Sequence, residues 1–425
     1  MRKRQGEAYP CLGPGTLGSV EMEGKKLLFI SHTNKLPNRV LSMIDHFMTR
    51  NEVFLLNCQR DRSMKNNFQG IKYINIYSPG QFLGMILFYI KALRICRVLD
   101  FDLGYCSSIR MLPLLAAVAR QKGGAVIYDS IEIPTLLGAQ KIASRLKAVS
   151  EKHIRRFLEA FEGLLLRLAN GVLVIDSRDD VLLKRLRKVQ PNAECIMNYP
   201  SNQVPLNQEE VDRFHEQYRG RKLIVYAGGM FGAKGLYRYF DLTARLKEDD
   251  QSILLLMVGM LRFGENRKEI DEYLRKKGLI DHVQFLPWMN YRSLLALLQC
   301  ARVGLALQDP GFFYFQFASM GNSRKPFTYM LAGVPVVVSL PVIGRFVEEK
   351  GVGRYVDFHD GDAIYRAVRE ILTDDGLHGE MSRRGKQLIQ RECNWENELF
   401  KAERVFERAL KGPAKRQVIP WKKSR

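Results

Sequence analysis

Residues 223–235 read Leu-Ile-Val-Tyr-Ala-Gly-Gly-Met-Phe-Gly-Ala-Lys-Gly, an apolar run that passes directly into a glycine-rich segment. An unbroken apolar run is typical of a strand that is buried on both faces of a parallel sheet. The residues that follow, 233–247, carry apolar positions at helical spacing. The stretch therefore predicts a strand, a tight turn and a helix in succession, which is the repeating unit of an α/β fold.

The same alternation continues on both sides of this stretch. In the first half, apolar runs predict strands at residues 27–30, 53–56, 73–74, 103–106, 125–128 and 172–175. In the second half, they predict strands at residues 223–226, 253–258, 283–286, 303–307 and 334–338. Two α/β halves in tandem follow from this pattern.

A polar segment with Asn and Pro at residues 198–210 predicts a linker between the halves. We expect two doubly wound, Rossmann-like α/β domains at residues 25–200 and 201–392, facing a cleft. Ligands are expected in that cleft and at the carboxyl ends of the strands. The remaining segments are expected to be a flexible tail at 1–24, a helix at 393–411 and a basic tail at 412–425.

The charge of the chain narrows the classes of partner. It has 425 residues, with 66 Lys and Arg against 45 Asp and Glu, and a formal net charge of +21. Such a charge predicts attraction to nucleic acid, an anionic membrane or a phosphorylated substrate. No zinc-ligand spacing or recognised nucleic-acid-binding motif accompanies the charge. We therefore expect no nucleic-acid partner, and a nucleic-acid-binding protein is kept only as the alternative of another class.

Cysteine usage and hydropathy indicate the compartment. The seven cysteines include no Cys-x-x-Cys pair, which favours a reduced, cytoplasmic setting. Residues 1–24 contain no apolar core of a secretory signal. The most apolar stretch spans residues 82–90, whereas a bilayer-crossing helix needs roughly 20 residues. We expect a cytoplasmic chain without a transmembrane helix.

Two segments are candidates for phosphate binding. Glycines such as Gly228 and Gly229 let backbone amides approach a phosphate at a helix N-terminus, and Lys234 would add a positive charge. An ordinary tight turn explains the same spacing, which is neither a P-loop nor a dinucleotide fingerprint. In the second segment, Asn322 precedes Ser323, a suitable helix cap, and Lys325 lies in the first helical turn. Cations there oppose the helix dipole, so either a bound anion offsets them or the placement is by chance.

The order of these motifs resembles the nucleotide-sugar glycosyltransferases of family 4, or group 1, which have the two-domain GT-B fold. Gly228, Lys234 and Gly235 are similar to that family's Gly-Arg-x-x-x-x-Lys-Gly pattern. Residues 325–336 are similar to its Lys-x-Phe-Glu-Tyr-Met-x-Ala-Gly-x-Pro-Val signature. In the first half, residues 37–40 and 128–132 are similar to segments of one branch. The resemblance covers about residues 26–411, and it implies that the helix at 393–411 crosses back to the first domain.

The resemblance implies transfer of a sugar, of hexosyltransferase type, from a nucleoside diphosphate sugar to a hydroxyl group. It further implies retention of anomeric configuration, no metal and no other cofactor, and an acceptor that is a saccharide or a lipid-linked saccharide in cell-surface polysaccharide synthesis. The donor-binding residues it implies are Gly228, Gly229, Lys234, Asn322, Ser323, Lys325 and Thr328. The catalytic residues we expect are Lys234, Lys325, Glu132 and His32, and the acceptor-binding residues are Arg39 and Glu132.

The chain departs from the family pattern at several polar positions. Gly229 stands where the family has an arginine, Thr328 and Met320 stand where it has glutamates, and Ile131 stands where it has a histidine. These departures leave open a catalytically inactive, glycosyltransferase-like binding subunit as an alternative. His32 and Glu132 each follow a predicted strand; a backbone-bonded loop histidine and a surface carboxylate are the alternatives there.

A basic segment predicts peripheral attachment to an anionic membrane, on the cytoplasmic side. Residues 141–156 contain six basic residues and one acidic residue, and the tail from Lys411 adds six more with Trp421 among them. Cations near an anionic leaflet favour reversible adsorption. Helical spacing suggests that one set of residues faces the core and another faces outward. The apolar set is Ile142, Leu146, Val149, Phe157 and Phe161, and the outer basic set is Lys141, Arg145, Lys152 and Arg156. A solvated basic helix and a loose tail are the alternative.

Overall fold

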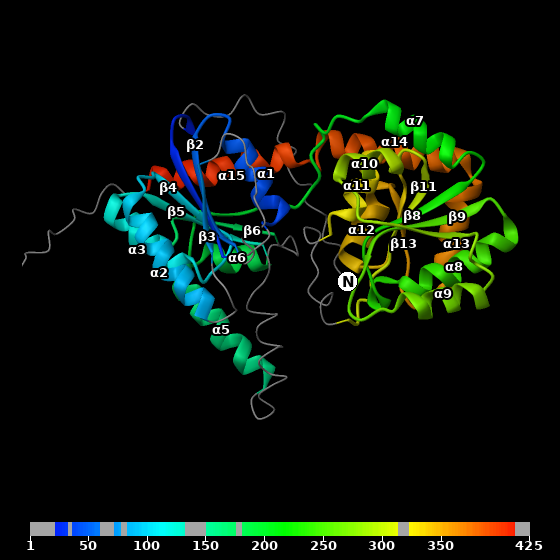
Figure 1. Cartoon of the computed structure of the whole chain (residues 1–425), viewed down its shortest axis with the longest axis horizontal. Helices are drawn as coiled ribbons and strands as arrows, with labels where there is room; N and C mark the ends of the chain where they lie inside the picture. The colour runs from blue at the N-terminus through cyan, green and yellow to red at the C-terminus, as the bar shows by residue number, and fades with distance from the viewer. Residues whose placement is uncertain are drawn as a thin grey trace, which may run out of the picture. The chain divides into compact units, whose positions relative to one another are not determined.

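The computed structural model describes residues 22–32, 36–59, 72–77, 83–131, 150–175, 181–312 and 323–412 (Figure 1). Contacts divide the chain into two compact units. The first unit comprises Met1–Val174, Leu183–Cys195 and Leu399–Arg425, and the second comprises Ile175–Leu182 and Ile196–Glu398. The two units are described separately below.

The first unit is built on a seven-stranded sheet in the order β3-β2-β1-β4-β5-β6-β7. Every neighbouring pair is parallel. The strands are β1 (Lys26–Ser31), β2 (Glu52–Gln59), β3 (Lys72–Tyr77), β4 (Leu103–Cys106), β5 (Ala125–Ser130), β6 (Gly171–Val174) and β7 (Ala193–Cys195). The strand order reverses between β1 and β4, which is where open α/β sheets bind ligands.

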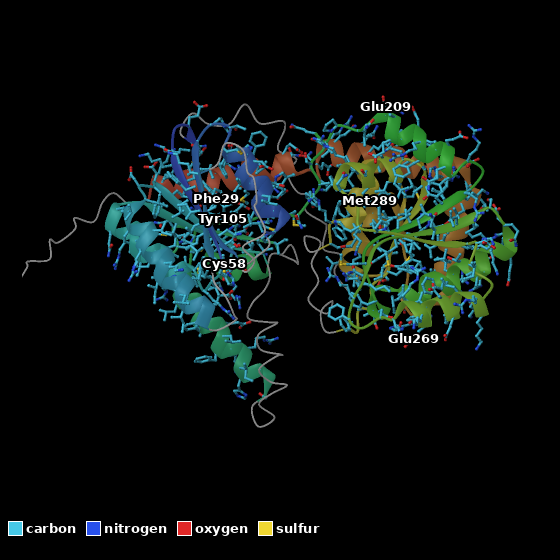
Figure 2. The ribbon with its side chains drawn as sticks, in the orientation of Figure 1. Phe29, Cys58, Tyr105, Glu209, Glu269 and Met289 are labelled. Carbon is cyan, nitrogen blue, oxygen red and sulfur yellow. The ribbon has the colours of Figure 1, made fainter. Side chains whose placement is uncertain are left out.

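Helices alternate with these strands, as the apolar runs and helical periods require. They are α1 (Asn38–Phe47), α2 (Leu83–Val98), α3 (Leu112–Lys122), α5 (Glu151–Leu166) and α6 (Val181–Arg187). Figure 2 shows Phe29 and Tyr105 together in the core of this unit, with ring centroids 4.8 Å apart. Both are fully buried, because β1 and β4 are central strands covered on both faces.

The second unit is built on a six-stranded parallel sheet in the order β10-β9-β8-β11-β12-β13. Its strands are β8 (Lys222–Met230), β9 (Ile253–Leu261), β10 (Val283–Leu286), β11 (Ala301–Ala306), β12 (Val336–Val338) and β13 (Gly353–Tyr355). Its helices are α7 (Gln208–Gln217), α8 (Leu236–Asp249), α9 (Arg267–Lys276), α10 (Tyr291–Leu298), α11 (Lys325–Ala332), α12 (Pro341–Lys350), α13 (Gly361–Thr373) and α14 (Asp375–Arg391).

The last helix, α15 (Trp395–Leu410), contributes to both units. Its first residues belong to the second unit, where the Trp395 backbone N–H donates to the Pro200 carbonyl at 2.9 Å. From Leu399 onward it belongs to the first unit, where Phe406 stacks on Phe47 with centroids 4.6 Å apart. The chain therefore leaves the second unit at Glu398 and ends its helical part in the first.

The fold class expected from the sequence, two doubly wound α/β units, is confirmed. One detail differs from expectation. Strands β8 and β9 are longer than their apolar runs, because the pairing continues through Gly228–Gly259 and Gly229–Met260. The basic segment at 141–156 is described only from residue 150, and α5 begins at Glu151, so its earlier expected positions, Lys141, Ile142, Arg145, Leu146 and Val149, lie outside the described residues. Within the described ranges, no helix is both long enough and apolar enough to cross a bilayer.

Candidate functional site

The candidate site forms where β8 and β9 end, next to the point at which the strand order of the second sheet reverses between β8 and β11. Gly228 and Gly229 lie inside β8 rather than in the turn that the sequence predicted. The turn comes later, at Gly232–Lys234, and α8 begins only at Leu236. Lys234 therefore lies in a short 3₁₀ turn before α8, not in the first turn of a long helix.

Gly228 makes room for Lys325. Its backbone φ is +141°, and a Cβ placed there would lie 2.5 Å from Lys325 Cε. Such a distance excludes any side chain unless the lysine moves. The Lys325 side chain starts at the first residue of α11, and its Nζ lies 5.0 Å from the centroid of the Tyr226 ring. The glycine and the lysine thus form one matched arrangement that links β8 to α11.

Burial shifts the pKa of Lys325 strongly. Burial, followed by the nearby charge of Lys234, lowers the pKa of Lys325 to about 7. The pKa of Lys234 is also lowered, first by burial and then by the charge of Arg262. Two neighbouring lysines with lowered pKa values are typical of an anion-binding site, because a bound anion favours the charged form of both.

Arg262, which the sequence did not single out, is the third cation of this cluster. It follows β9, and its backbone N–H donates to the Met230 carbonyl at 3.0 Å. A Cβ placed on Gly229 would lie 3.1 Å from Arg262 Cγ. The space beside Gly229 is therefore filled by an arginine from the neighbouring strand end. The family pattern has its own arginine at position 229, so the charge is supplied here from another segment.

Two of the three cations form no ion pair with a carboxylate among the residues that the structure describes. Among the described residues, no ion pair joins Lys325 or Arg262 to an acidic side chain. Glu265, the acid nearest in sequence, accepts from the Gly232 backbone N–H at 2.8 Å and from the Tyr237 hydroxyl at 3.2 Å. Lys234, Arg262 and Lys325, hereafter the cation cluster, therefore gather positive charge near the ends of β8 and β9.

The start of α11 differs from the sequence-based prediction. Ser323 is buried but does not cap the helix: Arg324 occupies the N-cap position, without a side-chain cap. Thr328 is only 4% exposed, and its hydroxyl donates to the Arg324 carbonyl at 3.2 Å. The hydroxyl is therefore bonded to the helix backbone. This geometry disfavours the predicted contact between Thr328 and a nucleotide ribose. Asn322 lies outside the described residues.

Arg39 is a core residue of the first unit, which corrects its assignment to acceptor binding. Its Nε and one Nη donate to the Asp129 carboxylate at 2.7 and 3.0 Å. The Tyr105 hydroxyl donates to the same carboxylate at 2.6 Å. Arg39 is 3% exposed and Asp129 is fully buried. The guanidinium is therefore used to join α1 to β5 and is covered from solvent.

The other first-unit candidates are only partly described. His32 follows β1 and is half-buried at the carboxyl end of that strand, next to the reversal of strand order between β1 and β4. Glu132 lies outside the described residues. Among the residues that the structure describes, no group of three or more His, Cys, Asp or Glu side chains is placed to hold a metal ion.

Comparison with solved structures identifies the fold. The chain is similar to HepE from Anabaena solved with UDP, at 15% identity and a TM-score of 0.66, covering 89% of this chain and 99% of that one. It is also similar to sucrose-phosphate synthase from Thermosynechococcus elongatus, at 16% identity and a TM-score of 0.64, covering 90% and 98%. WaaG, a glycosyltransferase involved in lipopolysaccharide biosynthesis, matches at 14% identity and a TM-score of 0.59, covering 89% and 99%. The fold is of the GT-B type.

A family model matches part of the sequence. Residues 207–388, which contain the cation cluster, match the family model of the glycosyl transferases group 1. The resemblance to that family seen in the sequence is therefore confirmed over residues 207–388 of the second unit. No curated protein sequence matches the chain.

Proposed function

We propose that this chain transfers a sugar from a nucleoside diphosphate sugar to a hydroxyl group of an acceptor. The observation that carries the proposal is the cation cluster, in which the positive charges of Lys234, Arg262 and Lys325 lie near one another beside the glycines of β8. A diphosphate would bring negative charge to this cluster and enough oxygens to contact all three side chains. The group 1 match over the same residues supports the assignment, as do the UDP and UDP-glucose named with the HepE structures.

The proposed chemistry depends on charge development. When the bond between the sugar and the diphosphate breaks, negative charge accumulates on the leaving diphosphate. Positive groups fixed in place before the reaction stabilise that charge without reorganisation. The Lys234, Arg262 and Lys325 side chains would perform this role, so the reaction as proposed needs no metal or other cofactor. Retention of the anomeric configuration is part of the proposal through the family resemblance.

His32 is proposed as the group of the first unit that faces the acceptor. It lies at the carboxyl end of β1, where open α/β sheets place their ligands, and an imidazole can exchange protons near neutral pH. We propose a saccharide or lipid-linked saccharide of cell-surface polysaccharide synthesis as the acceptor. The similarity to WaaG supports that class. The reaction would take place on the cytoplasmic face of the membrane.

Thermal-shift measurements with a panel of nucleoside diphosphate sugars test the donor site. A ligand at a hundred times its dissociation constant stabilises the folded state by about 2.7 kcal/mol, so a true donor should raise the melting temperature clearly. Lys325→Ala should abolish the shift, whereas the exposed Arg275→Ala on α9 should keep it. If no nucleotide shifts the wild-type protein, the donor site is refuted. Binding without sugar transfer would instead favour the inactive binding subunit.

A further inference from the structure

The outward face of α5 carries a stripe of large apolar side chains. Phe157 is 70% exposed, Phe161 is 51% exposed and Leu164 is 60% exposed. Spacings of four and three residues place all three on one side of the helix. The sequence prediction that Phe157 and Phe161 face the core is therefore wrong. Ile154 and Leu166 are the buried apolar residues of this helix instead.

Positive charge accompanies the stripe. At 100° per residue, the exposed Arg156 and Arg167 lie about 100° and 80° from Phe157, so these two cations flank the apolar stripe. Lys152 lies about 140° from Phe157, away from the stripe. The acids Glu159 and Glu162 point elsewhere, because both pair with Arg185, at 3.0 and 2.9 Å. Among the described side chains of α5, the outward arc therefore combines aromatic and aliphatic groups with cations and contains no acid.

The combination of apolar side chains and cations on α5 indicates which kind of partner binds this face. Single exposed apolar residues are normal on a protein surface, whereas a contiguous stripe marks an interaction site. An apolar protein partner would use the stripe but would leave the cations without a role. A helix that lies on an anionic lipid surface uses both, since its aromatic edge enters the headgroup boundary and its cations meet the lipid phosphates. In Figure 1, the N-terminal part of α5 also projects beyond the other described elements of its unit.

We propose that the outward face of α5 binds an anionic lipid surface. Each cation close to such a surface strengthens binding by roughly fivefold, and salt weakens this contribution. The inference rests on the proposed function and deepens it. If the acceptor is lipid-linked, the outward face of α5 is the surface that would bring the chain to that acceptor. Vesicle binding needs neither donor nor acceptor, so it is tested separately from catalysis.

Cosedimentation of the full chain with lipid vesicles is the test. One vesicle preparation is phosphatidylcholine alone, and the other is an equimolar mixture with phosphatidylglycerol. The wild-type protein should bind the anionic vesicles and should be released by rising sodium chloride. The double variants Phe157→Ser/Phe161→Ser and Arg156→Glu/Arg167→Glu should each reduce binding by roughly tenfold or more. These side chains are exposed, and circular dichroism will report whether each variant folds.

Matched controls come from the second unit. Lys268→Glu/Arg275→Glu makes the same charge change on the exposed side of α9, and Ile280→Ser removes an apolar side chain that is 51% exposed. Both controls should bind anionic vesicles as the wild type does. Equal loss in the controls, equal binding to neutral vesicles, or no binding at all would overturn the proposal. So would a dimer in sedimentation velocity that the Phe157→Ser/Phe161→Ser variant dissociates, because a second copy would then cover the stripe.

The proposed donor site and the proposed lipid-binding surface are tested by different measurements. Lys325→Ala should lose donor binding while keeping full vesicle binding, and Phe157→Ser/Phe161→Ser should show the reverse. Donor binding without vesicle binding in the wild type would refute the lipid surface alone. Vesicle binding without any nucleotide effect would refute the donor site alone.

Discussion

At the scale of single residues, Arg262 shows how a site can keep its charge while its sequence motif changes. The family pattern supplies an arginine at position 229, and this chain has glycine there. The space above that glycine is filled by Arg262, which belongs to a different strand end. No short motif could have revealed this, because the two positions become neighbours only through the parallel pairing of β8 with β9.

Arg262→Ala is expected to weaken donor binding by about 1.5–3 kcal/mol, the range for a hydrogen bond to a charged group. The free energy of unfolding should change little, because the residue is exposed. Adding Gly229→Arg to this variant should restore part of the affinity, since removal of the Arg262 side chain clears the adjacent space. Calorimetric titration with UDP measures all three proteins. Unchanged affinity in Arg262→Ala would remove Arg262 from the site.

Donor binding should depend on pH through Lys325. Its pKa in the free protein is lowered to about 7 by burial and by the charge of Lys234. A bound diphosphate favours the charged lysine and therefore raises this pKa. Binding should then take up a proton above pH 7, and affinity should fall as the pH rises further. Below pH 7 the lysine is already charged, so its contribution should be constant.

Titration calorimetry in buffers of different ionisation enthalpy measures this proton uptake. A nucleoside diphosphate sugar is the suitable ligand, because its diphosphate has no free terminal phosphate that titrates near neutrality. Lys325→Met should bind more weakly and should lose most of the pH dependence. An unchanged pH dependence in that variant would assign the effect to another group, such as Lys234, whose pKa is also lowered.

At the scale of secondary structure, the order of strands and helices could be predicted because parallel strands buried on both faces leave unbroken apolar runs. The ends of β8 and β9 could not be predicted, since glycines usually indicate a turn, and here Gly228 and Gly259 lie opposite each other in paired strands. The orientation of α5 was also missed. Its apolar residues recur on two sides, and periodicity alone does not say that Ile154 is buried and Phe157 exposed.

The buried pair of Arg39 and Asp129 joins α1 to β5 and should be a major stabilising contact of the first unit. Removing one partner of a buried ion pair costs about 3–5 kcal/mol, because the other charge stays buried and unpaired. Arg39→Ala should therefore lower the free energy of unfolding by this amount. Lys26→Ala, which breaks an ion pair with the exposed Asp100, should leave it nearly unchanged, because solvent screens an exposed pair. Urea denaturation compares the two, and similar values would contradict the assigned role of Arg39.

At the scale of the whole molecule, the proposals assign different ligands to different units: a nucleotide to the second and a lipid surface to the first. Hydrogen exchange followed by mass spectrometry can test this division in one protein. UDP should slow exchange at the ends of β8 and β9 and at the start of α11, because ordering of the cation cluster suppresses local opening there. Anionic vesicles should slow exchange in α5. Protection by UDP confined to the first unit, or protection by vesicles confined to the second, would contradict the division, since each ligand would then act on the unit that lacks its proposed contact surface.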